Sequence, residues 1–424
     1  MHDLRVLREQ AADLRAAMRR RGQEEILAPT IDRAVELDRD RRATIQAVEE
    51  RKAARNALSQ EVARRKKAGE TADEAQASSR ALGDEIARLE TELAAAESEL
   101  ENLLLQLPNA VLEDVQSGGE ESNKVVREWG TPRAADGVAP HWETGERLGL
   151  VDMARGAKIA GSGFIVFRGE GARLVRALLN LMLDLHTREH GYEETWVPVL
   201  VNRAAMTGTS QLPKFEDDMY ALKEDDLFLI PTAEVPLTNL YREEILLESD
   251  LPKSFAAYSP CFRREAGSHG KDTRGLLRVH EFDKVELVRY AVPERSTEEL
   301  ELLTGHAERV LQLLELPYRV VLLAAGDTGF ASAKTYDLEV FAPGVGKWLE
   351  VSSCSCFTDF QARRADIRYR PADGGKPRFV HTLNGSGLAL PRIIAALLEH
   401  GLQPDGSVLL PEALRPYTRT ERLT

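Results

Sequence analysis

The segment from residue 260 to residue 282, PCFRREAGSHGKDTRGLLRVHEF, places four arginines and a lysine close together in a chain whose formal net charge is −13. Strand-forming residues on both sides of a Gly-rich turn predict an antiparallel hairpin with a long loop. Because residues two apart share a strand face, Arg263 and Glu265 should point to one side and Arg264 to the other. A guanidinium can bind phosphate through two hydrogen bonds, and a neighbouring carboxylate can accept from an amino group. The pattern fits a nucleotide site, or an exposed hairpin with cross-strand ion pairs.

Two further segments carry oxygen-rich side chains. Thr232 and Glu234 lie two residues apart in FLIPTAEVPLTNL, where a helix-capping threonine followed by an acidic first turn would give the same pattern. Glu350, Ser352 and Ser353 are predicted to end a strand in KWLEVSSCS, and such hard oxygen atoms suit Mg²⁺ beside phosphates. A serine-rich turn is the alternative interpretation of this segment.

Arg392 follows a predicted strand and a predicted tight Gly-Ser-Gly turn in HTLNGSGLALPRIIAALLEHG. Pro391 marks the start of a helix, and Gly401 marks its end. Arg392 therefore lies in the first turn of a buried helix, where the helix dipole disfavours a cation. We expect an anionic group to compensate it.

The composition limits the classes of protein that this chain can belong to. Its 424 residues, 43% of them hydrophobic, suffice for a large core and about two domains. The first residues lack the apolar stretch of a secretory signal, and no run approaches the ~20 apolar residues of a membrane span, so we expect a cytoplasmic protein. The three cysteines, with Cys354 and Cys356 separated by one residue, predict neither a disulfide framework nor a structural zinc. The acidic net charge means that any contact with nucleic acid has to be local.

A heptad pattern predicts a long helix over residues 75–107. A second helix is predicted over residues 30–67, and AGETAD between them contains a helix stop and a new cap. The two helices should form one antiparallel hairpin that extends as an arm. Near its tip lie four successive cations, which either complement the helix dipole in solvent or contact a polyanion: Arg64, Arg65, Lys66 and Lys67. The predicted seam of the later helix is Leu82, Ile86, Leu89, Leu93, Ala96, Leu100, Leu103 and Leu107.

The remainder of the chain divides into a connection and a mixed region. Residues 108–150 are rich in Gly, Pro and acidic side chains and are expected to be an irregular linker. From residue 151 onward helices alternate with strands, and one helix is predicted to stop at Gly191. The strand ETWVPVLV follows, in which Pro198 predicts the edge of a sheet or an interface.

In their order along the chain, these segments resemble a bacterial-type seryl-tRNA synthetase, a class II aminoacyl-tRNA synthetase, over essentially the whole length. The region around Pro198, about 171–202, resembles motif 1. CFRREAG…TRGLLRVHEF, within about 255–290, resembles motif 2, and NGSGLALPRI, within about 380–400, resembles motif 3. TGTSQLPKF, PTAEVPLTN, EVSSCS, FQARR and LNGSGLA resemble the serine enzyme in particular.

The resemblance implies an α+β fold. An N-terminal tRNA-binding arm domain would span residues 1–107, with the helical hairpin at about 30–107, and a connection would span 108–150. The catalytic domain, 151–424, would be built on an antiparallel β-sheet flanked by helices.

The resemblance also implies two adjoining sites. Arg263 and Arg392 would be catalytic: Arg263 would hold the α-phosphate of ATP and the serine carboxylate, and Arg392 would meet the γ-phosphate. Glu350 and Ser353 would bind Mg²⁺ with ATP. The implied ATP-binding residues are Arg263, Arg264, Glu265, Val279, Glu350, Val351, Ser352, Ser353 and Arg392. The implied serine-binding residues are Thr232, Ala233, Glu234, Arg263, Glu286, Asn384 and Ser386. Contacts with tRNA are assigned to Arg64, Arg65, Lys66, Lys67, Lys271 and Arg274.

The implied reaction is ATP-dependent activation of L-serine to seryl-adenylate, followed by transfer to the 3′ end of tRNA(Ser), with tRNA(Sec) left open as a further acceptor. The implied assembly is a homodimer through the motif 1 region, without membrane attachment. Two positions depart from the family pattern: Arg264 replaces a small residue, and Cys356 replaces an asparagine. We expect Arg264 to make its contacts outside the ATP site.

Three other kinds of protein share parts of this pattern. A ligase that charges a protein carrier would lack the long arm, and an inactive coiled-coil interaction protein would have lost Arg263, Glu265, Glu350 or Arg392, all of which are present. A class II enzyme for proline or threonine would need a C-terminal domain larger than the about 25 residues that follow the motif 3 helix.

Overall fold

The computed structural model describes residues 1–266 and 274–424. Lys271, one of the residues assigned to tRNA, lies outside these ranges. The chain forms two compact units. The first contains Met1–Arg19 and Gln23–Pro108, and the second contains Arg20–Gly22 and Asn109–Thr424.

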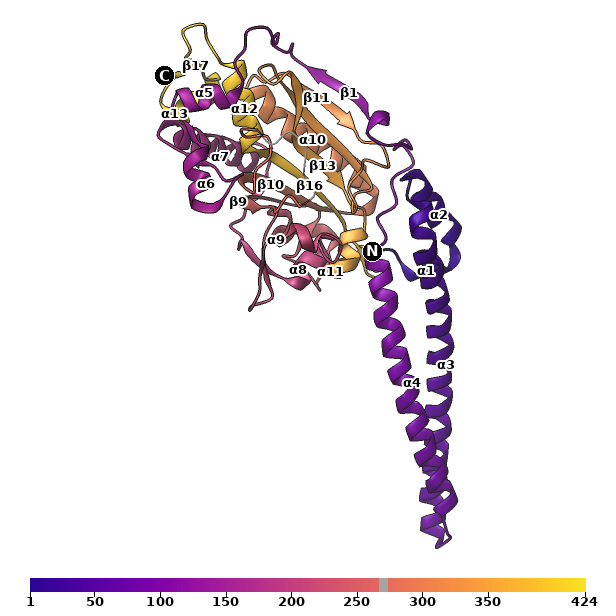
Figure 1. Ribbon diagram of the computed structural model, residues 1–424. Helices are drawn as coiled ribbons and strands as arrows, with labels where there is room; N and C mark the ends of the chain where they lie inside the picture. The colour runs from indigo at the N-terminus through magenta and orange to yellow at the C-terminus, as the bar shows by residue number, and fades with distance from the viewer. Residues whose placement is uncertain (267–273) are drawn as a thin grey trace. The chain divides into compact units, whose positions relative to one another are not determined.

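The first unit is a long antiparallel helical hairpin with two short helices, α1 (Leu4–Glu9) and α2 (Ala11–Arg20), packed near its base (Figure 1). Helix α3 (Glu24–Ala68) has 45 residues and α4 (Asp73–Leu105) has 33, so they extend for about 65 and 50 Å. Gly69 ends α3 with φ 73°, and its N–H donates to the carbonyl groups of Arg65 and Lys66. The predicted hairpin is confirmed.

Two kinds of contact hold the hairpin together. Near the base a buried core forms between α1, α2, α3 and α4, and it includes Leu7, Met18, Ile31, Leu104 and Leu107. Beside this core and beyond it, basic residues of α3 pair with acidic residues of α4, because α3 is rich in arginine and α4 in glutamate. These pairs are Arg33–Glu99, Arg41–Glu97, Arg51–Glu85 and Lys52–Glu90.

The second unit is built on an eight-stranded sheet in the order β1-β11-β12-β13-β16-β10-β9-β4 (Figure 1). All neighbouring pairs in it are antiparallel except β9 and β4. This sheet confirms the predicted fold class. Its strands are β1 (Lys124–Trp129), β4 (Glu193–Glu194), β9 (Lys253–Phe262), β10 (Glu281–Ala291), β11 (Tyr318–Leu322), β12 (Lys334–Ala342), β13 (Lys347–Cys356) and β16 (His381–Ala389).

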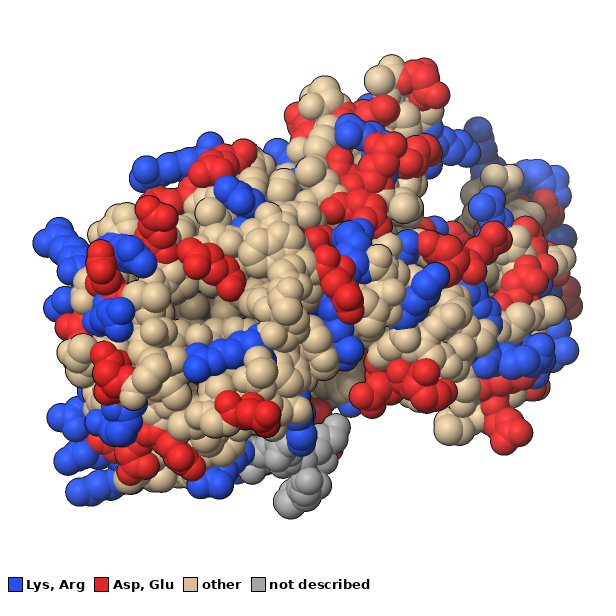
Figure 2. Space-filling view, turned by 90° about the horizontal axis from the view of Figure 1, so that it is seen from above, with Lys and Arg blue, Asp and Glu red and all other residues tan. Residues whose placement is uncertain are grey.

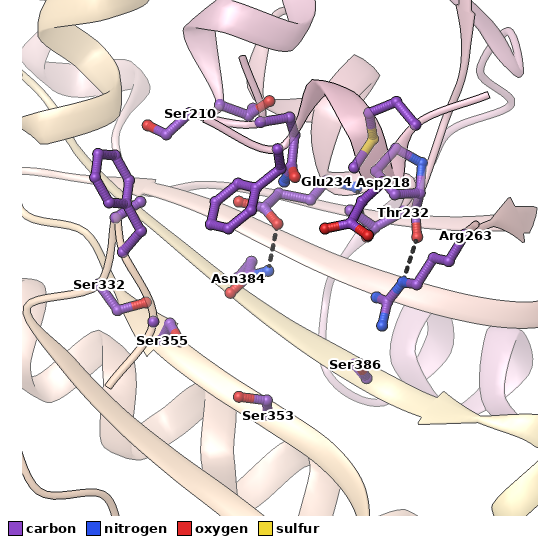
Figure 3. A pocket seen from close by; sticks show the side chains of 18 of the residues that line it. Ser210, Asp218, Thr232, Glu234, Arg263, Ser332, Ser353, Ser355, Asn384 and Ser386 are labelled. Carbon is purple, nitrogen blue, oxygen red and sulfur yellow. Dashed lines mark hydrogen bonds between the residues drawn. The ribbon is translucent and has the colours of Figure 1, made fainter. Parts of the chain in front are cut away.

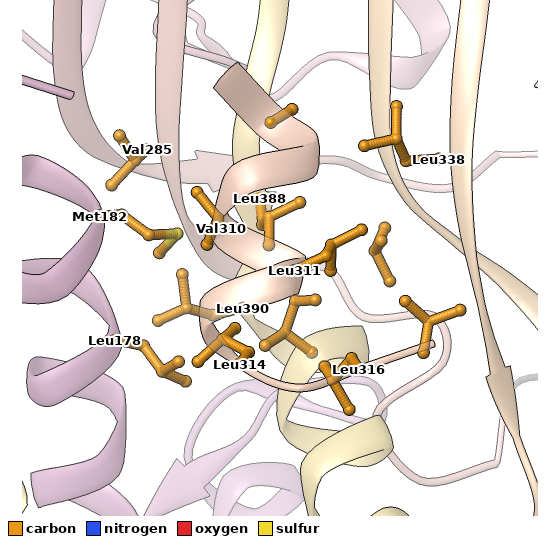
Figure 4. Close-up of a cluster of buried hydrophobic side chains, with 14 of the residues drawn as sticks. Leu178, Met182, Val285, Val310, Leu311, Leu314, Leu316, Leu338, Leu388 and Leu390 are labelled. Atoms are coloured by element: carbon orange, nitrogen blue, oxygen red, sulfur yellow. The ribbon is translucent and has the colours of Figure 1, made fainter. Parts of the chain in front are cut away.

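Helices α7 (Glu170–Arg188), α10 (Ser296–Leu313) and α12 (Leu390–His400) cover one face of this sheet. Figure 4 shows their contact: Leu178, Val310 and Leu390 meet strand residues such as Val285 and Leu338. These side chains are almost completely buried, and burial of each contributes about 1.5–3 kcal/mol. Odd-numbered residues of β10, such as Val285 and Leu287, therefore point toward these helices and form part of the core.

The even-numbered residues of β10 lie on the other face and change character along the strand. Val288 and Tyr290 are buried in a second core with residues of α9 (Glu234–Thr238) and α11 (Phe360–Ala365). Lys284 and Glu286 precede them and are buried but charged. One strand therefore supports an apolar layer at one end and a polar site at the other.

Smaller elements surround this framework. No helix in the described ranges is long and apolar enough to cross a membrane. Basic and acidic side chains are interspersed over the face in Figure 2. The remaining helices are α5 (His141–Arg147), α6 (Met153–Ala160), α8 (Arg203–Gly208) and α13 (Arg415–Thr418). The remaining strands are β2 (Val151–Asp152), β3 (Val166–Phe167), β5 (Leu200–Asn202), β6 (Ala221–Leu222), β7 (Leu227–Leu229), β8 (Ile245–Leu247), β14 (Arg368–Arg370), β15 (Arg378–Phe379), β17 (Val408–Leu409) and β18 (Arg422–Leu423).

The predicted tight Gly-Ser-Gly turn is wrong, because β16 runs straight through it to Ala389. The two glycines are needed for close packing instead. A Cβ atom on Gly385 would lie 2.9 Å from Cys354 Sγ, and one on Gly387 would lie 2.9 Å from His186 Nε2.

Three other expectations about local structure also change. The expected linker, 108–150, contributes β1 to the edge of the main sheet and contains α5. The predicted strand ETWVPVLV is broken into β4 and β5, with Pro198 between them. Glu350 and Ser353 lie within β13 rather than at its end, because that strand continues to Cys356.

Candidate active site

A cavity of about 530 Å³ lies in the second unit, over the polar end of β10 (Figure 3). A smaller cavity of about 100 Å³ adjoins it and shares Arg263, Glu265, Lys284 and Ser386 with it. Predicted site residues that line the larger cavity are Thr232, Glu234, Arg263, Glu265, Glu350, Ser353, Asn384 and Ser386. Predicted residues that line the smaller one also include Val279, Val351 and Arg392.

Some predicted site residues line neither cavity. Ala233 is completely buried at the start of α9, and Ser352 is buried with its hydroxyl donating to the Ser386 carbonyl oxygen at 2.7 Å. Arg264 is exposed, and its backbone N–H donates to the carbonyl oxygen of Asp218 at 3.0 Å. Glu286 is completely buried beneath residues that do line the cavity. The side chains of Ala233, Ser352 and Glu286 are therefore buried behind the cavity lining, whereas that of Arg264 is exposed.

Arg263 and Glu265 both line the two cavities, but not because of strand alternation. Strand β9 ends at Phe262, and Glu265 has φ 51°, so the backbone turns between them. The Arg263 guanidinium lies 5.2 Å from the centre of the Phe282 ring and donates to the carbonyl oxygen of Pro231 at 3.4 Å. Glu265 accepts a hydrogen bond from Arg278, which also lines both cavities.

Glu234 is the most buried carboxylate at the edge of the larger cavity. Burial, and then the charge of Glu286, raises the pKa of Glu234 to about 7. Asn384 connects the two carboxylates, since its amide nitrogen lies 2.9 Å from Glu234 Oε2 and 3.2 Å from Glu286 Oε1. Gln361 donates to Glu234 Oε1 at 2.7 Å, which opposes the rise in pKa. The network can therefore hold Glu234 close to its point of ionisation at neutral pH.

Lys284 supplies the positive charge that Glu286 requires. Its ammonium pairs with Glu286 Oε2 and donates to Thr232 Oγ1 at 2.9 Å. The Thr232 hydroxyl in turn donates to Glu286 at 2.9 Å. Because an ammonium has three donors and two have these partners, Lys284 can direct the third into the cavities that it lines.

Arg392 lies in the first turn of α12, as predicted, and reaches the smaller cavity. Its Nε donates to the Leu277 carbonyl oxygen at 3.1 Å, and its Nη1 donates to the Glu350 carbonyl oxygen at 2.6 Å. The Glu350 carboxylate lies 3.4 Å from the same nitrogen. These oxygen acceptors offset the unfavourable position of the Arg392 charge near the N-terminus of the helix.

Carboxylates also gather in a third cavity, lined by Asp337, Glu339, Glu350 and Arg392 among others. Its volume is about 640 Å³, and the terms larger and smaller cavity continue to mean the adjoining pair of about 530 and 100 Å³. Burial and the charge of Glu350 raise the pKa of Asp337 well above its usual value. Within the described ranges, no group of three or more His, Cys, Asp or Glu side chains could hold a metal ion by itself. A divalent ion here would thus need ligands from a substrate or from water.

The cations assigned to tRNA lie in different environments. Arg64 and Arg65 both pair with Glu61. Arg64, Lys66 and Lys67 are exposed at the C-terminal end of α3. Arg274, in the second unit, places its guanidinium 4.7 Å from the centre of the Trp142 ring.

Comparison with known proteins decides the family. Residues 1–111 match the Seryl-tRNA synthetase N-terminal domain, and residues 214–401 match the tRNA synthetase class II core domain (G, H, P, S and T). The serine–tRNA ligase of Gemmatimonas aurantiaca is 67% identical over 418 residues, which cover 98% of each chain. This chain belongs to the seryl-tRNA synthetase family.

The seryl-tRNA synthetase fold is equally clear. A crystal structure of the seryl-tRNA synthetase from Pyrococcus horikoshii complexed with ATP has a TM-score of 0.94 and 37% sequence identity, covering 100% of this chain and 99% of that one. The cytoplasmic serine–tRNA ligase from Naegleria fowleri in complex with AMP has a TM-score of 0.88 and 30% identity, with the same coverage. The resemblance inferred from the motifs is confirmed.

Sequence reasoning missed several residues of the candidate site. Lys284 lies two residues before Glu286 on β10, so strand alternation could have placed them on one face. Gln361 is in the FQARR motif, but only the fold brings it to Glu234. Arg278 lies in the motif 2 segment and lines all three cavities.

Proposed function

We propose that this chain is a serine–tRNA ligase that activates L-serine with ATP to seryl-adenylate and transfers the seryl group to the 3′ end of tRNA(Ser). One observation carries the proposal. Arg263 lies at the junction of two cavities, between the Glu234–Asn384 network and the compartment that contains Val279 and Arg392. A single guanidinium there can contact both a serine carboxylate and the α-phosphate of a nucleotide.

The serine site would use the network over β10. A carboxylate pair balanced by one lysine can accept hydrogen bonds from the ammonium and hydroxyl groups of a small amino acid. Thr232, Glu234, Asn384 and Ser386 would contact serine, with Glu286 and Ala233 behind them. Alanine would leave these buried polar groups unpaired, so a pocket of this kind discriminates strongly against it.

The nucleotide would occupy the smaller cavity and extend from it. Glu265 would accept from the adenine amino group, Val279 would pack near the base, and Arg392 would meet the γ-phosphate. The serine carboxylate attacks the α-phosphorus, and pyrophosphate leaves. Charge on the phosphates is met by Arg263 and Arg392, so positioning and electrostatic stabilisation supply most of the catalysis.

Mg²⁺ is part of this proposal. Glu350 and Ser353 both line the larger cavity and offer the carboxylate and hydroxyl oxygen atoms that Mg²⁺ prefers. These two side chains would hold the ion, and phosphate oxygens and water would complete its shell. When bound, Mg²⁺ neutralises phosphate charge.

The arm would bind tRNA. Lys66 and Lys67 are exposed cations at the end of α3, and Arg274 beside Trp142 is a candidate contact in the catalytic unit. We propose tRNA(Ser) as the acceptor and a cytoplasmic location, where charged tRNA is used. A transcript of tRNA(Sec) assayed alongside tRNA(Ser) decides whether it is a further acceptor.

A homodimer through residues 171–202 completes the proposal. Trp196 in this region is 82% exposed, and such exposure of a large apolar side chain is typical of an interface. Trp196→Arg should convert a dimer into a monomer in light scattering after gel filtration. A monomeric wild-type protein would contradict this part.

The deciding experiment is pyrophosphate exchange into ATP by the purified protein. We expect exchange with L-serine and none above background with L-alanine. Equal exchange with both would exclude the serine assignment. Charging of a tRNA(Ser) transcript, but not of a protein carrier, tests the second step.

A further inference from the structure

A buried histidine and a buried glutamate connect two distant parts of the second unit. His141, the first residue of α5, has its Nδ1 atom 2.8 Å from Glu399 Oε1 in the last turn of α12. The His141 backbone N–H donates to the same oxygen at 3.0 Å, and Gly344 N–H donates to Glu399 Oε2 at 2.8 Å. Both side chains are completely buried.

The other ring nitrogen of His141 has a partner that fixes its role. The backbone N–H of Leu276 donates to His141 Nε2 at 3.0 Å. A backbone N–H can only donate, so Nε2 must accept and carries no hydrogen. Nδ1 therefore carries the ring hydrogen and donates it to Glu399.

Leu276 is the first residue of a wall of the smaller cavity, which continues through Leu277, Arg278 and Val279. Helix α12 contacts this wall through two residues, Arg392 and Glu399. Arg392 donates directly to the Leu277 carbonyl oxygen, and Glu399 holds the neighbouring Leu276 N–H through His141. The two residues of α12 are seven apart, so they lie on the same side of the helix, about 10 Å from each other.

The contact made by Arg392 and the contact made by His141 and Glu399 differ in whether they can persist when a nucleotide binds. The Arg392 side chain is 29% exposed, and in the proposed function its guanidinium turns to the γ-phosphate. The Leu277 carbonyl oxygen then loses that donor. His141 and Glu399 line none of the three cavities, so their contacts can persist during nucleotide binding.

We propose that His141 and Glu399 are positioning residues of the ATP site. They keep the Leu276–Val279 wall in place when the Arg392 guanidinium leaves the Leu277 carbonyl oxygen and contacts phosphate. This inference rests on the proposed assignment of the smaller cavity to ATP. The atom that matters is the acceptor nitrogen His141 Nε2, because its removal leaves the Leu276 N–H buried without a hydrogen-bond acceptor.

Two substitutions separate this role from general packing. In His141→Gln the longer amide reaches the Leu276 N–H and can still donate to Glu399. In His141→Asn the amide reaches only as far as the ring Nδ1 position, so it keeps Glu399 and loses Leu276. His400→Asn is the matched control: His400 is the next residue of α12, its Nε2 lies 2.7 Å from the Phe341 carbonyl oxygen, and it has no link to the wall.

The measurements are the Kd for ATP by calorimetric titration, the KM values for ATP and serine in pyrophosphate exchange, and the thermal midpoint of each variant. We expect H141N to weaken ATP about tenfold in both Kd and KM, with the KM for serine changed less than twofold. H141Q and H400N should bind ATP within about twofold of wild type.

Three results would overturn the proposal: equal ATP affinity of H141N and wild type, an equal rise in both KM values, or a loss in H400N as large as that in H141N. If H141N does not fold, H141Q decides alone, because a tenfold loss of ATP affinity in that variant contradicts the proposal. The titration does not require serine activation. A wild-type protein that binds ATP but fails to exchange would thus contradict the proposed function and leave the test of His141 intact.

Discussion

The side-chain amide of Gln361 is fixed in one orientation between Glu234 and Thr382. Its nitrogen donates to Glu234 Oε1 at 2.7 Å, and its oxygen accepts from Thr382 Oγ1 at 2.7 Å. In this orientation the amide nitrogen of Gln361 faces Glu234, and a donor stabilises the ionised carboxylate. This contact acts on the carboxylate that we assign to serine binding.

Replacing Gln361 with Leu should therefore raise the pKa of Glu234 above about 7. We expect the KM for serine at pH 7 to increase about fivefold and to approach the wild-type value at pH 8.5, since higher pH restores the carboxylate. Exchange assays at the two pH values measure this. Gln312→Leu, which removes a 3.0 Å hydrogen bond to the Tyr318 hydroxyl far from the site, is the control. A defect in Q361L of the same size at both pH values would mean that Gln361 acts only through packing.

The wild-type enzyme should itself show a pH-dependent KM for serine. Burial raises the pKa of Glu234 to about 7, so the free carboxyl is mostly protonated at pH 6 and mostly ionised at pH 8. The substrate ammonium favours the ionised form, so the KM should fall about tenfold as the pH rises from 6 to 8. In Glu234→Gln this dependence should disappear, leaving a high KM at every pH. An unchanged pH profile in E234Q would show that another group titrates.

Lys284→Met tests the buried ion pair. The substitution leaves the Glu286 carboxylate buried without its cation, so we expect the free energy of unfolding to fall by about 3–5 kcal/mol in urea denaturation. Adding Glu286→Gln should recover most of this stability but not serine activation. Lys334→Met is the control, because its partner Asp114 has a side chain 57% exposed and can be solvated when the lysine is lost. Losses of equal size in K284M and K334M would contradict the argument.

The sequence carried enough information for the fold but not for every contact in the site. The heptad seam, the hairpin and the helix that begins beside Pro391 all follow from local patterns, which act within a few residues. The role of Gly385 and Gly387 does not follow from local patterns, because glycine occurs both in turns and at sites of close packing. Only the positions of Cys354 and His186 show that these two glycines serve close packing. Lys284 and Gln361 were missed because a buried charge or amide is understood only with its distant partner.

The metal assignment predicts a changed requirement for Mg²⁺. We expect Glu350→Gln to need at least about tenfold more Mg²⁺ for half-maximal serine-dependent exchange, because a carboxylate ligand is lost. Glu339→Gln should stay within about twofold of wild type, since Glu339 lines the third cavity but pairs with Arg319. The same Mg²⁺ dependence in E350Q and wild type would remove Glu350 from the metal site.

The arm assignment predicts an effect confined to tRNA. Lys66→Glu combined with Lys67→Glu should raise the KM for tRNA(Ser) at least about tenfold and reduce the slope of log affinity against log salt by about 2. Serine-dependent exchange should be unchanged. Arg64→Gln with Arg65→Gln should have a smaller effect, because both guanidinium groups already pair with Glu61. If the two double variants are equally impaired, pairing with Glu61 does not decide which cations contact tRNA.

The ion pairs between α3 and α4 also make the length of the arm adjustable. The large apolar cluster lies at the base of the hairpin, and beyond it buried residues such as Val48 and Ile86 are accompanied by pairs such as Arg41–Glu97 and Arg51–Glu85. Removing one heptad from each helix between these pairs would shorten the hairpin by about 10 Å and keep the remaining partners opposite each other. Engineering can therefore shorten the arm in whole heptads and keep its remaining ion pairs.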